Sequence, residues 1–506
     1  MASRFQLKAL CAGIRVVQWG STTPLWNQTK FAPGGLVCIQ KDIAGLGVDE
    51  EHYITANLMK LWSFLCTNEH VRLCVTGPPG TGKSSTVWAW CVTVAKTKNV
   101  LWIHRGRDFV TAVRLKRGGV ASCVLSANCN YETLFSDSDL VVFDGARNQE
   151  RTTKLWESVA GFAANHKTVS FVIVTSTQFR SFMEDRDELG VHQTFEVLSW
   201  TSGDYVGASE ASTSLRARLW VRCRASTLRD VQLKFALCGG CARWMFRMNR
   251  EDIEDEIDSQ IRAVTVEDLD AGFEGDKARS TISHLFGRDD AGAFLVSEFI
   301  VRKIVWRFKR EFIKKAYTQN ICRQNPTFDG WMWEEDVLLQ ARTASETHMP
   351  LKLYDSSGAV HAQWNVGEII YFDKPDDFLD PIELQTCKRG QYTNIKDAGD
   401  TDLLWPMKWN NPCYDVGQIL VKDKTIRFCQ ITRSAQHSLK LEYVRRMVTA
   451  LCNLFEVQKV EIVVIQPWGL HKEQFCITKC DEKILAPWGW KQSELIRVFM
   501  DRNPQK

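Results

Sequence analysis

Residues 77–84 read Gly-Pro-Pro-Gly-Thr-Gly-Lys-Ser, a glycine-rich loop that ends in Lys83 and Ser84. The apolar run Arg72–Thr76 before the loop is typical of a short strand, and residues 84–95 after it favour a helix. Glycines let backbone N–H groups curl around a phosphate at a helix N-terminus, where the helix dipole favours an anion. The pattern predicts a phosphate-binding loop made of Gly77, Pro78, Pro79, Gly80, Thr81, Gly82, Lys83, Ser84 and Ser85.

Such a loop predicts a nucleoside triphosphate ligand, and we expect ATP with Mg²⁺. Lys83 would reach the β- and γ-phosphates, and the Ser84 hydroxyl would ligate Mg²⁺. A second Mg²⁺ ligand is expected at Asp144, because the apolar strand 140–143 ends there. Gly145 follows, at a position where many ATPases place a glutamate that activates water. Hydrolysis is therefore expected to be slow, or its base to come from elsewhere in the fold.

Two further groups are candidates for sensing the γ-phosphate. Residues 171–177 read as the next strand and end in Thr-Ser-Thr, which either senses the phosphate or is an ordinary strand end. Arg243 follows a tight turn at residues 239–240. It is either a fixed cation that reaches the γ-phosphate and couples occupancy to domain movement, or a surface or salt-bridged arginine.

The composition is that of an ordinary globular chain of 506 residues, with 44% hydrophobic and 25% charged residues. A net charge of +4 does not imply nucleic acid by itself. The 17 cysteines follow no regular framework, which favours free thiols in a reducing compartment. No apolar run approaches the roughly 20 residues of a membrane helix, so no membrane partner is expected. Residues 9–17 make a poor secretory segment because Gly13 and Arg15 interrupt them.

The order of patterns along the chain predicts an α/β protein. Short β-rich runs at 73–76, 100–103, 140–143 and 171–174 alternate with helical stretches, which indicates a parallel sheet flanked by helices. The expected parts are an N-terminal segment (1–50), a P-loop NTPase domain (51–250), a helical connector (251–320) and a second α/β domain (321–506). Residues 301–315 predict a basic amphipathic helix, which either packs on a core with a solvated basic face or contacts nucleic acid.

A second group of polar residues lies in the C-terminal third. Asp415 stands at the head of a predicted strand, and the next strand carries Gln430 and Thr432 two residues apart, hence on one face. His437 and Lys440 follow. An acid beside a polar pair on a hairpin is the layout of metal-dependent phosphodiesterases, in which carboxylates hold Mg²⁺. Glu334, in the predicted helix that begins near Trp333-Glu-Glu335, would add another metal ligand.

The same residues also allow a module that binds nucleic acid without cutting it. Gln430 occupies a position that is usually acidic in such sites, and Thr432 stands where a lysine is usual. The Gln430 amide oxygen can still ligate a metal but brings no charge, so a lower metal affinity is expected, with Lys440 as the substitute cation. The expected metal ligands are Ser84 and Asp144 in the first site, and Asp415, Glu334 and Gln430 in the second.

Taken in order, these elements resemble the Crinkler and retrotransposon hot-spot superfamily of eukaryotic pathogens and fungi. The resemblance covers residues 50–506, and its more specific parts are Trp200-Thr201, Gly239-Gly-x-x-Arg243 and Gln430-x-Thr432 with His437. It implies a P-loop NTPase joined to a nuclease-like domain of the restriction-endonuclease fold. Lys83, Ser84, Asp144 and Arg243 then form the nucleotide set, and the nuclease face comprises Glu334, Asp415, Gln430, Thr432, His437 and Lys440.

The resemblance also implies an effector that is secreted and acts in a host nucleus, although residues 1–50 carry no Leu-Phe-Leu-Ala-Lys-like leader. The leading hypothesis is an ATP-binding ATPase coupled to a Mg²⁺-dependent DNA endonuclease. Its expected partners are double-stranded DNA and host nuclear proteins, and oligomers are compatible with it. The alternative is a nucleotide-gated DNA- or protein-binding effector whose nuclease-like domain is inactive. A metabolic kinase explains neither the Asp415 hairpin nor the chain length.

Overall fold

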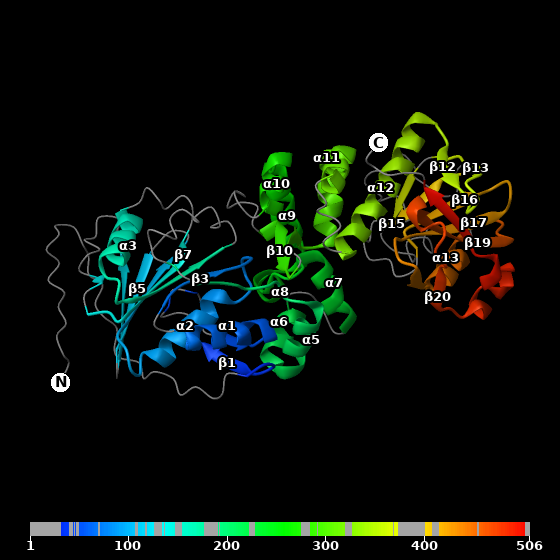
Figure 1. Cartoon of the computed structure of the whole chain (residues 1–506). Coiled ribbons are helices and arrows are strands. Elements are labelled where there is room, and N and C mark those ends of the chain that lie inside the picture. Colours follow the sequence, from blue (N-terminus) through cyan, green and yellow to red (C-terminus); the bar gives the residue numbers. More distant parts are fainter. Residues whose placement is uncertain are drawn as a thin grey trace. The chain divides into compact units, whose positions relative to one another are not determined.

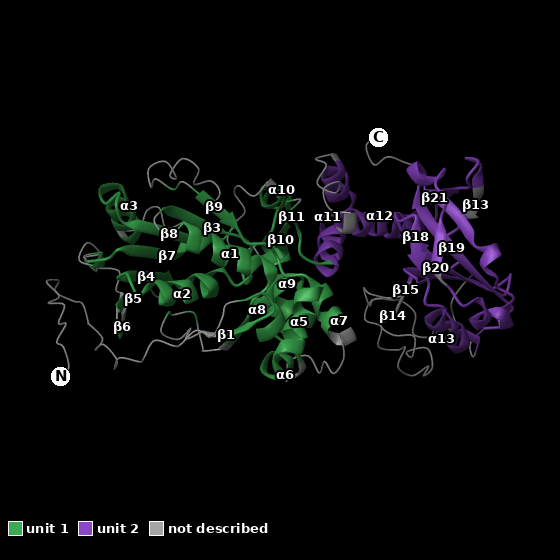
Figure 2. Ribbon diagram, turned by 60° about the horizontal axis from the view of Figure 1, so that its bottom comes forward, with its two compact units in different colours: residues 1–297 green, residues 298–506 purple. Residues whose placement is uncertain are grey.

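The structure, a computed structural model, divides into two compact units, Met1–Ser297 and Glu298–Lys506 (Figure 2). The residues that it describes are 32–39, 44, 46, 50–68, 71–106, 110–116, 119–125, 134–135, 137–146, 154–176, 191, 193–221, 228–274, 284–290, 292–318, 326–367, 369–372, 400–406, 414–452 and 455–500. Within these ranges, no helix combines the length and the apolarity that a membrane crossing requires.

A seven-stranded sheet forms the centre of the first unit, in the order β6-β5-β4-β7-β8-β3-β9 (Figure 1). Its strands are β3 (Arg72–Thr76), β4 (Val100–Arg105), β5 (Val110–Lys116), β6 (Gly119–Leu125), β7 (Leu140–Ala146), β8 (Ser170–Thr175) and β9 (Gln193–Glu196). From β4 to β9 each neighbouring pair is parallel, whereas β5 and β6 extend the sheet in antiparallel fashion. The carboxyl ends of β3, β4, β7 and β8 therefore meet at one edge, where open α/β sheets bind ligands.

Helices pack on both faces of this sheet, so its central strands are mostly apolar, with polar residues near their ends. The helix α2 (Lys83–Val94) brings Trp88 against Trp102 of β4, with ring centroids 5.3 Å apart. Successive strand residues point to opposite faces, so Ile103 lies on the other side. There α3 (Lys154–Asn165) packs Leu155, Trp156, Val159 and Ala163 against Leu101, Ile103, Val141 and Phe143. A further helix, α1 (Ala56–Thr67), contacts α2.

A largely helical region follows the sheet. It comprises α5 (Ser202–Ala211), α6 (Thr213–Val221), α7 (Leu228–Cys238), α8 (Ala242–Arg247), α9 (Arg250–Ala263) and α10 (Val266–Glu274). Thr201 and Asp204 form a capping box that starts α5. The buried Tyr205 hydroxyl donates to the Gly239 carbonyl at 3.2 Å, which ties α5 to the turn before α8. Two antiparallel pairs complete the unit, β1 (Leu36–Ile39) with β2 (Glu50–Tyr53) and β10 (Phe286–Asp289) with β11 (Gly292–Leu295).

The second unit is built on an eight-stranded mixed sheet in the order β13-β12-β21-β19-β17-β16-β15-β14. Its strands are β12 (Leu351–Tyr354), β13 (Val360–Trp364), β14 (Ile369–Phe372), β15 (Leu403–Pro406), β16 (Val416–Leu420), β17 (Thr425–Ile431), β19 (Lys459–Pro467) and β21 (Ile496–Met500). The neighbours β17, β19 and β21 are parallel, whereas β16 is antiparallel to β17. A small separate pair joins β18 (Gln436–Ser438) to β20 (Cys476–Lys479).

Two apolar cores cover opposite faces of this sheet. Ile426 and Phe428 of β17 pack with α13 (Leu441–Cys452), whereas Cys429 and Ile431 pack with α12 (Pro326–Thr347), as their alternation in the strand requires. The preceding helix, α11 (Glu298–Thr318), has non-helical backbone angles at Lys309. Short 3₁₀ turns lie at Trp468–Leu470, Glu482–Ile484, Ala486–Trp488 and Gln492–Glu494.

The α/β class and the mixed, largely parallel sheet of the first unit confirm the coarse prediction. The runs at 73–76, 100–103, 140–143 and 171–174 are β3, β4, β7 and β8. The division between the units falls inside the predicted connector 251–320, because α9 and α10 belong to the first unit and α11 to the second. Most of the predicted segment 1–50 lies outside the described residues.

Candidate functional site

The glycine-rich loop joins β3 to α2, as the sequence predicts. Gly77, Gly80 and Gly82 all have positive φ angles, and the Thr81 hydroxyl closes the loop by donating to the Pro78 carbonyl at 2.9 Å. Gly80 is also required by space, since a Cβ there would lie 2.7 Å from the Cys241 sulfur. The loop is therefore held in a conformation that leaves its backbone close to the segment before α8.

Lys83 lies inside this loop and is almost completely buried. Its ammonium donates to the carbonyl oxygens of Gly77 at 2.8 Å and Pro78 at 2.6 Å. Burial lowers the pKa of Lys83 to about 7, the Arg243 charge adds to that shift, and the Asp144 carboxylate opposes it. The ammonium thus lacks a full counter-charge, which a bound phosphate would supply.

Ser84 and Asp144 meet as the sequence predicts for Mg²⁺ ligands. The Ser84 hydroxyl donates to Asp144 Oδ1 at 2.8 Å, and Asp144 is buried in β7 near its carboxyl end. The predicted Ser85 continues α2. At the end of β8, the buried Thr175 hydroxyl donates to the Ala146 carbonyl at 2.7 Å, and Thr177 lies outside the described residues.

The other Asp144 oxygen binds a residue that the sequence did not single out. His104 Nδ1 lies 2.6 Å from Asp144 Oδ2, because β4 and β7 are parallel neighbours that place His104 opposite Asp144. A polar residue at the end of an apolar run, Val100-Leu-Trp-Ile-His104, was the available signal. Gly145 beside it has a φ of +87°, and a Cβ there would lie 2.5 Å from the Arg105 carbonyl oxygen.

Two downstream residues reach the loop from the helical region. The Trp200 indole donates to the Thr81 carbonyl at 3.1 Å. Arg243, in the first turn of α8, has its Cβ 3.1 Å from the position that a Gly80 Cβ would take. Its side chain is exposed, and no ion pair to it is found among the described residues. The exposed side chain agrees with the alternative of a surface arginine, the start of α8 lies beside the loop, and the role of γ-phosphate sensor stays a prediction.

In the second unit the fold brings Glu334, Asp415 and Gln430 together. Asp415 precedes β16, and its Oδ2 accepts hydrogen bonds from Gln430 Nε2 at 2.7 Å and from the Ile431 backbone N–H at 2.5 Å. Glu334 comes from α12. Burial and the nearby Glu334 carboxylate raise the pKa of Asp415 well above its usual value. Asp415 therefore contacts Gln430 directly, and Glu334 is near enough to act on the pKa of Asp415.

A cation from α11 already lies among these acids. The Arg302 guanidinium pairs with Glu334 at 2.5 Å, Glu335 at 2.7 Å and Glu298 at 3.4 Å, with 13% of its side chain exposed. Burial raises the pKa of Glu335 to about 7 despite the opposing Arg302 charge. The sequence placed this arginine on the basic face of the helix 301–315, whereas the structure buries it. Among the described residues, no three acidic, histidine or thiol groups converge as a metal-ligand set.

The remaining predicted nuclease residues lie outside this cluster. The Thr432 hydroxyl accepts a hydrogen bond from the Ser434 N–H at 3.0 Å. His437 is in β18, and burial alone lowers its pKa. Lys440 is exposed just before α13. Within the described residues, no contact joins His437 or Lys440 to Asp415.

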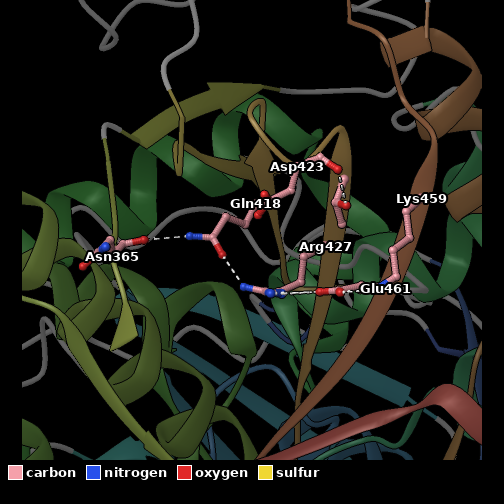
Figure 3. Close-up of polar contacts among 7 residues, drawn as sticks. Asn365, Gln418, Asp423, Arg427, Lys459 and Glu461 are labelled. Atoms are coloured by element: carbon pink, nitrogen blue, oxygen red, sulfur yellow. Dashed lines mark hydrogen bonds and ion pairs between the residues drawn. The ribbon is translucent and has the colours of Figure 1, made fainter. Parts of the chain in front are cut away.

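A second polar row crosses the sheet of this unit (Figure 3). Gln418 donates to the Asn365 carbonyl at 2.8 Å and accepts from Arg427 at 2.9 Å, and Arg427 pairs with Glu461 at 2.9 Å. The Arg427 guanidinium also stacks on Trp364, 4.8 Å from the ring centroid. These partners satisfy one another, so the row joins β16, β17 and β19 rather than presenting groups to a ligand.

No protein-family model matches the chain, and no curated protein matches it. Among solved structures, it is similar to the RuvB Holliday junction branch migration motor of Thermotoga maritima, with 13% identity and a TM-score of 0.28 over 47% of this chain and 91% of that one. It is also similar to a DNA replication initiation factor, with 10% identity and a TM-score of 0.24 over 55% of this chain and 93% of that one. These are distant structural similarities, and the resemblance to Crinklers stays a prediction.

Proposed function

We propose that the first unit is an ATP-binding P-loop NTPase and that nucleotide acts in it as a switch. The observation that carries this proposal is the 2.8 Å hydrogen bond from Ser84 to Asp144 beside the buried Lys83. It joins the loop after β3 to the expected carboxylate of β7, which is separated from β3 by β8 in the sheet. Lys83 would exchange its carbonyl partners for the β- and γ-phosphates.

The residues fit Mg²⁺. The Ser84 hydroxyl oxygen and Asp144 Oδ1 are hard oxygen donors that already lie 2.8 Å apart. Mg²⁺ in proteins is usually held by one or two such groups, with waters and substrate phosphates completing the shell. When bound, Mg²⁺ would neutralise charge on the phosphates.

The switch would act through Arg243 and Trp200. Both belong to the region after the sheet, and both reach the loop that would surround the phosphates. An exposed guanidinium at that place would add a charge-assisted contact when a γ-phosphate is present. Occupancy would then favour one position of α8 over others, which is the differential contact that a ligand-driven switch requires.

Equilibrium binding of fluorescent ATP and GTP analogues tests this proposal. The wild-type protein should bind with Mg²⁺ present, Lys83→Ala should not, and Lys96→Ala is the matched control because Lys96 is exposed beyond α2. Equal binding by wild type and Lys83→Ala contradicts the assignment of the loop. Comparison of the two analogues settles the base preference, for which we propose ATP.

For the second unit we propose nucleotide-gated binding of double-stranded DNA without cleavage. Arg302 favours this over catalysis, because it occupies the carboxylate centre and is ion-paired to both Glu334 and Glu335. Asp415 Oδ2 is likewise engaged by two donors. As arranged, the cluster does not fit a divalent metal, and we assign no step through one.

A Mg²⁺-dependent endonuclease is the second candidate. The hydrogen bond between Gln430 and Asp415, with Glu334 near enough to raise the pKa of Asp415, favours it, and Gln430 would supply an uncharged oxygen ligand. For this activity, Arg302 would have to break its ion pairs with Glu334 and Glu335. Incubation of plasmid DNA with the protein, ATP and Mg²⁺ distinguishes the two candidates, since cleavage that is lost in Asp415→Ala supports the endonuclease.

We also propose, on the resemblance alone, a Crinkler-like effector that acts in a host nucleus and contacts nuclear proteins there. A fluorescently tagged full-length chain expressed in eukaryotic cells tests the location. Nuclear accumulation is expected, and exclusion from the nucleus contradicts the proposal.

A further inference from the structure

The carboxyl end of β7 has no room for the glutamate that commonly holds the attacking water in a P-loop ATPase. Gly145 has a left-handed φ of +87°, and any Cβ there would lie 2.5 Å from the Arg105 carbonyl oxygen. The pairing of β7 with β8 also shifts register between Asp144 and Ala146, as it does at a bulge. The chain therefore needs a different group for the water.

His104 is the polar side chain that the structure brings to this place. It lies near the carboxyl end of β4, directly opposite Asp144 of β7. Since β3, β4 and β7 run in the same direction, His104 lies at the sheet edge from which the phosphate loop emerges. About 15% of its side chain is exposed, so the ring is held by the protein and still reaches solvent.

The contacts of Asp144 determine which nitrogen of the His104 ring is available to a further hydrogen-bond partner. Ser84 donates to Asp144 Oδ1, and Nδ1 of His104 is 2.6 Å from Oδ2. An ionised carboxylate only accepts hydrogen bonds, so the Nδ1 that faces Asp144 carries a proton, and in the neutral form of such a ring Nε2 is an acceptor. Within the described residues, no hydrogen bond to Nε2 is found. One carboxylate thus faces the Mg²⁺ ligand Ser84 on one side and orients an imidazole on the other.

We infer that His104 orients the water that attacks the γ-phosphate, in place of the glutamate that position 145 cannot hold. This inference rests on the proposed nucleotide function. Nε2 accepts a hydrogen bond from the water, whose oxygen forms a bond to the γ-phosphorus. The bond from phosphorus to the bridging oxygen breaks, and its electron pair leaves on ADP. Both water protons end on the inorganic phosphate, which leaves as dihydrogen phosphate, and His104 neither gains nor loses a proton overall.

Two substitutions of His104 distinguish orientation of the attacking water from a role that is limited to the hydrogen bond with Asp144. In His104→Asn the amide N–H can still donate to Asp144, but the acceptor that Nε2 offers is lost. In His104→Ala both are lost. His166→Asn is the matched control, since His166 is an exposed histidine of the same unit whose ring hydrogen-bonds to and stacks on Phe162.

The experiment measures the affinity for a fluorescent ATP analogue with Mg²⁺ and, separately, the single-turnover hydrolysis of ATP. Both His104 variants should hydrolyse at least about tenfold more slowly than wild type, with His104→Asn binding the analogue within about threefold of wild type. Hydrolysis by His104→Asn at the wild-type rate would show that the ring only supports Asp144, and an unchanged rate in His104→Ala would remove any role. Either result overturns the inference.

A wrong assignment of nucleotide binding would give a different set of results. If wild type and Lys83→Ala both fail to bind the analogue, the nucleotide site itself is wrong. If wild type binds ATP and shows no single-turnover hydrolysis at all, nucleotide binding stands and the role of His104 falls.

Discussion

The Trp200 indole N–H donates a 3.1 Å hydrogen bond to the carbonyl oxygen of Thr81, so a residue just before α5 holds the middle of the glycine-rich loop. Thr81 is completely buried and Trp200 nearly so. This bond links the loop to the region that carries Arg243. It also gives a physical role to the Trp-Thr element on which the family resemblance rests.

Removing that bond should loosen the loop. Trp200→Phe leaves the buried Thr81 carbonyl without this donor, which costs about 1–3 kcal/mol. We expect a lower unfolding midpoint and weaker binding of ATP analogue, measured by urea titration and fluorescence. Trp488→Phe, in a 3₁₀ turn of the second unit, is the control and should leave nucleotide affinity unchanged. A Trp200→Phe protein with wild-type affinity and stability would contradict this role.

The buried charge of Lys83 should lower the stability of the protein when no nucleotide is bound. Burial lowers its pKa to about 7, which marks the penalty for holding the charge there. Lys83→Met should therefore unfold at a midpoint equal to or above that of wild type without nucleotide, yet lose the stabilisation that ATP and Mg²⁺ give to wild type. Thermal unfolding with and without ligand measures both effects. A strongly destabilised Lys83→Met would mean that its hydrogen bonds to Gly77 and Pro78 outweigh the burial cost.

A glutamate at position 145 should destabilise the protein and should not speed hydrolysis. Gly145→Glu requires a left-handed backbone and a contact with the Arg105 carbonyl, so we expect a loss of at least about 1–3 kcal/mol of unfolding free energy and no gain in hydrolysis. Gly161→Ala is the matched control, because Gly161 is inside α3 with no atom within 4 Å of a Cβ there. That variant should be neutral or more stable by up to about 1 kcal/mol. Faster hydrolysis by Gly145→Glu would be the contrary result.

Arg302 should stabilise the second unit through its ion pairs with buried acids. Arg302→Met leaves the buried Glu334 and Glu335 unpaired, at a cost of about 3–5 kcal/mol. If the acids then accept another cation, Mn²⁺ should raise the melting temperature of Arg302→Met but not that of Arg302→Met with Asp415→Asn. Arg342→Met, which breaks an exposed pair with Glu346, should cost about 0.5 kcal/mol or less. A harmless Arg302→Met substitution would show that the ion pairs are unimportant.

His284 should make the first unit sensitive to acid. Burial, with the nearby Arg243 and Lys83 charges, lowers the pKa of His284 to about 3, while the unfolded chain keeps the usual value near 6.5. Between these values the unfolded state binds more protons, so stability falls as the pH drops below about 6.5, by at most about 1.4 kcal/mol per pH unit. Urea titrations at pH 7 and pH 5 should show a larger loss for wild type than for His284→Gln. Equal losses would contradict the shifted pKa, and His166→Gln serves as the exposed control.

The sequence predicted the glycine-rich loop with the strand before it and the helix after it. It also predicted Asp144 at the end of an apolar strand. These features depend on local patterns of glycine and apolar residues. It also placed Asp415 and Gln430 on a hairpin that the structure contains. His104 and Arg302 were missed, since each acquires its role from a neighbour that is distant in sequence. His104 meets Asp144 only through the pairing of β4 with β7. The basic side chains of the helix 301–315 were expected either to be solvated or to contact nucleic acid, but the acids of α12 provide Arg302 with partners that allow burial.

We propose that nucleotide at the loop controls DNA binding by the second unit, which does not cut the DNA. Retention of labelled double-stranded DNA by the full-length chain, with and without ATP and Mg²⁺, tests it most directly. We predict retention that depends on nucleotide in wild type, is absent in Lys83→Ala, and leaves the DNA intact. Retention that is the same with and without nucleotide, or DNA that is cleaved, would contradict the claim.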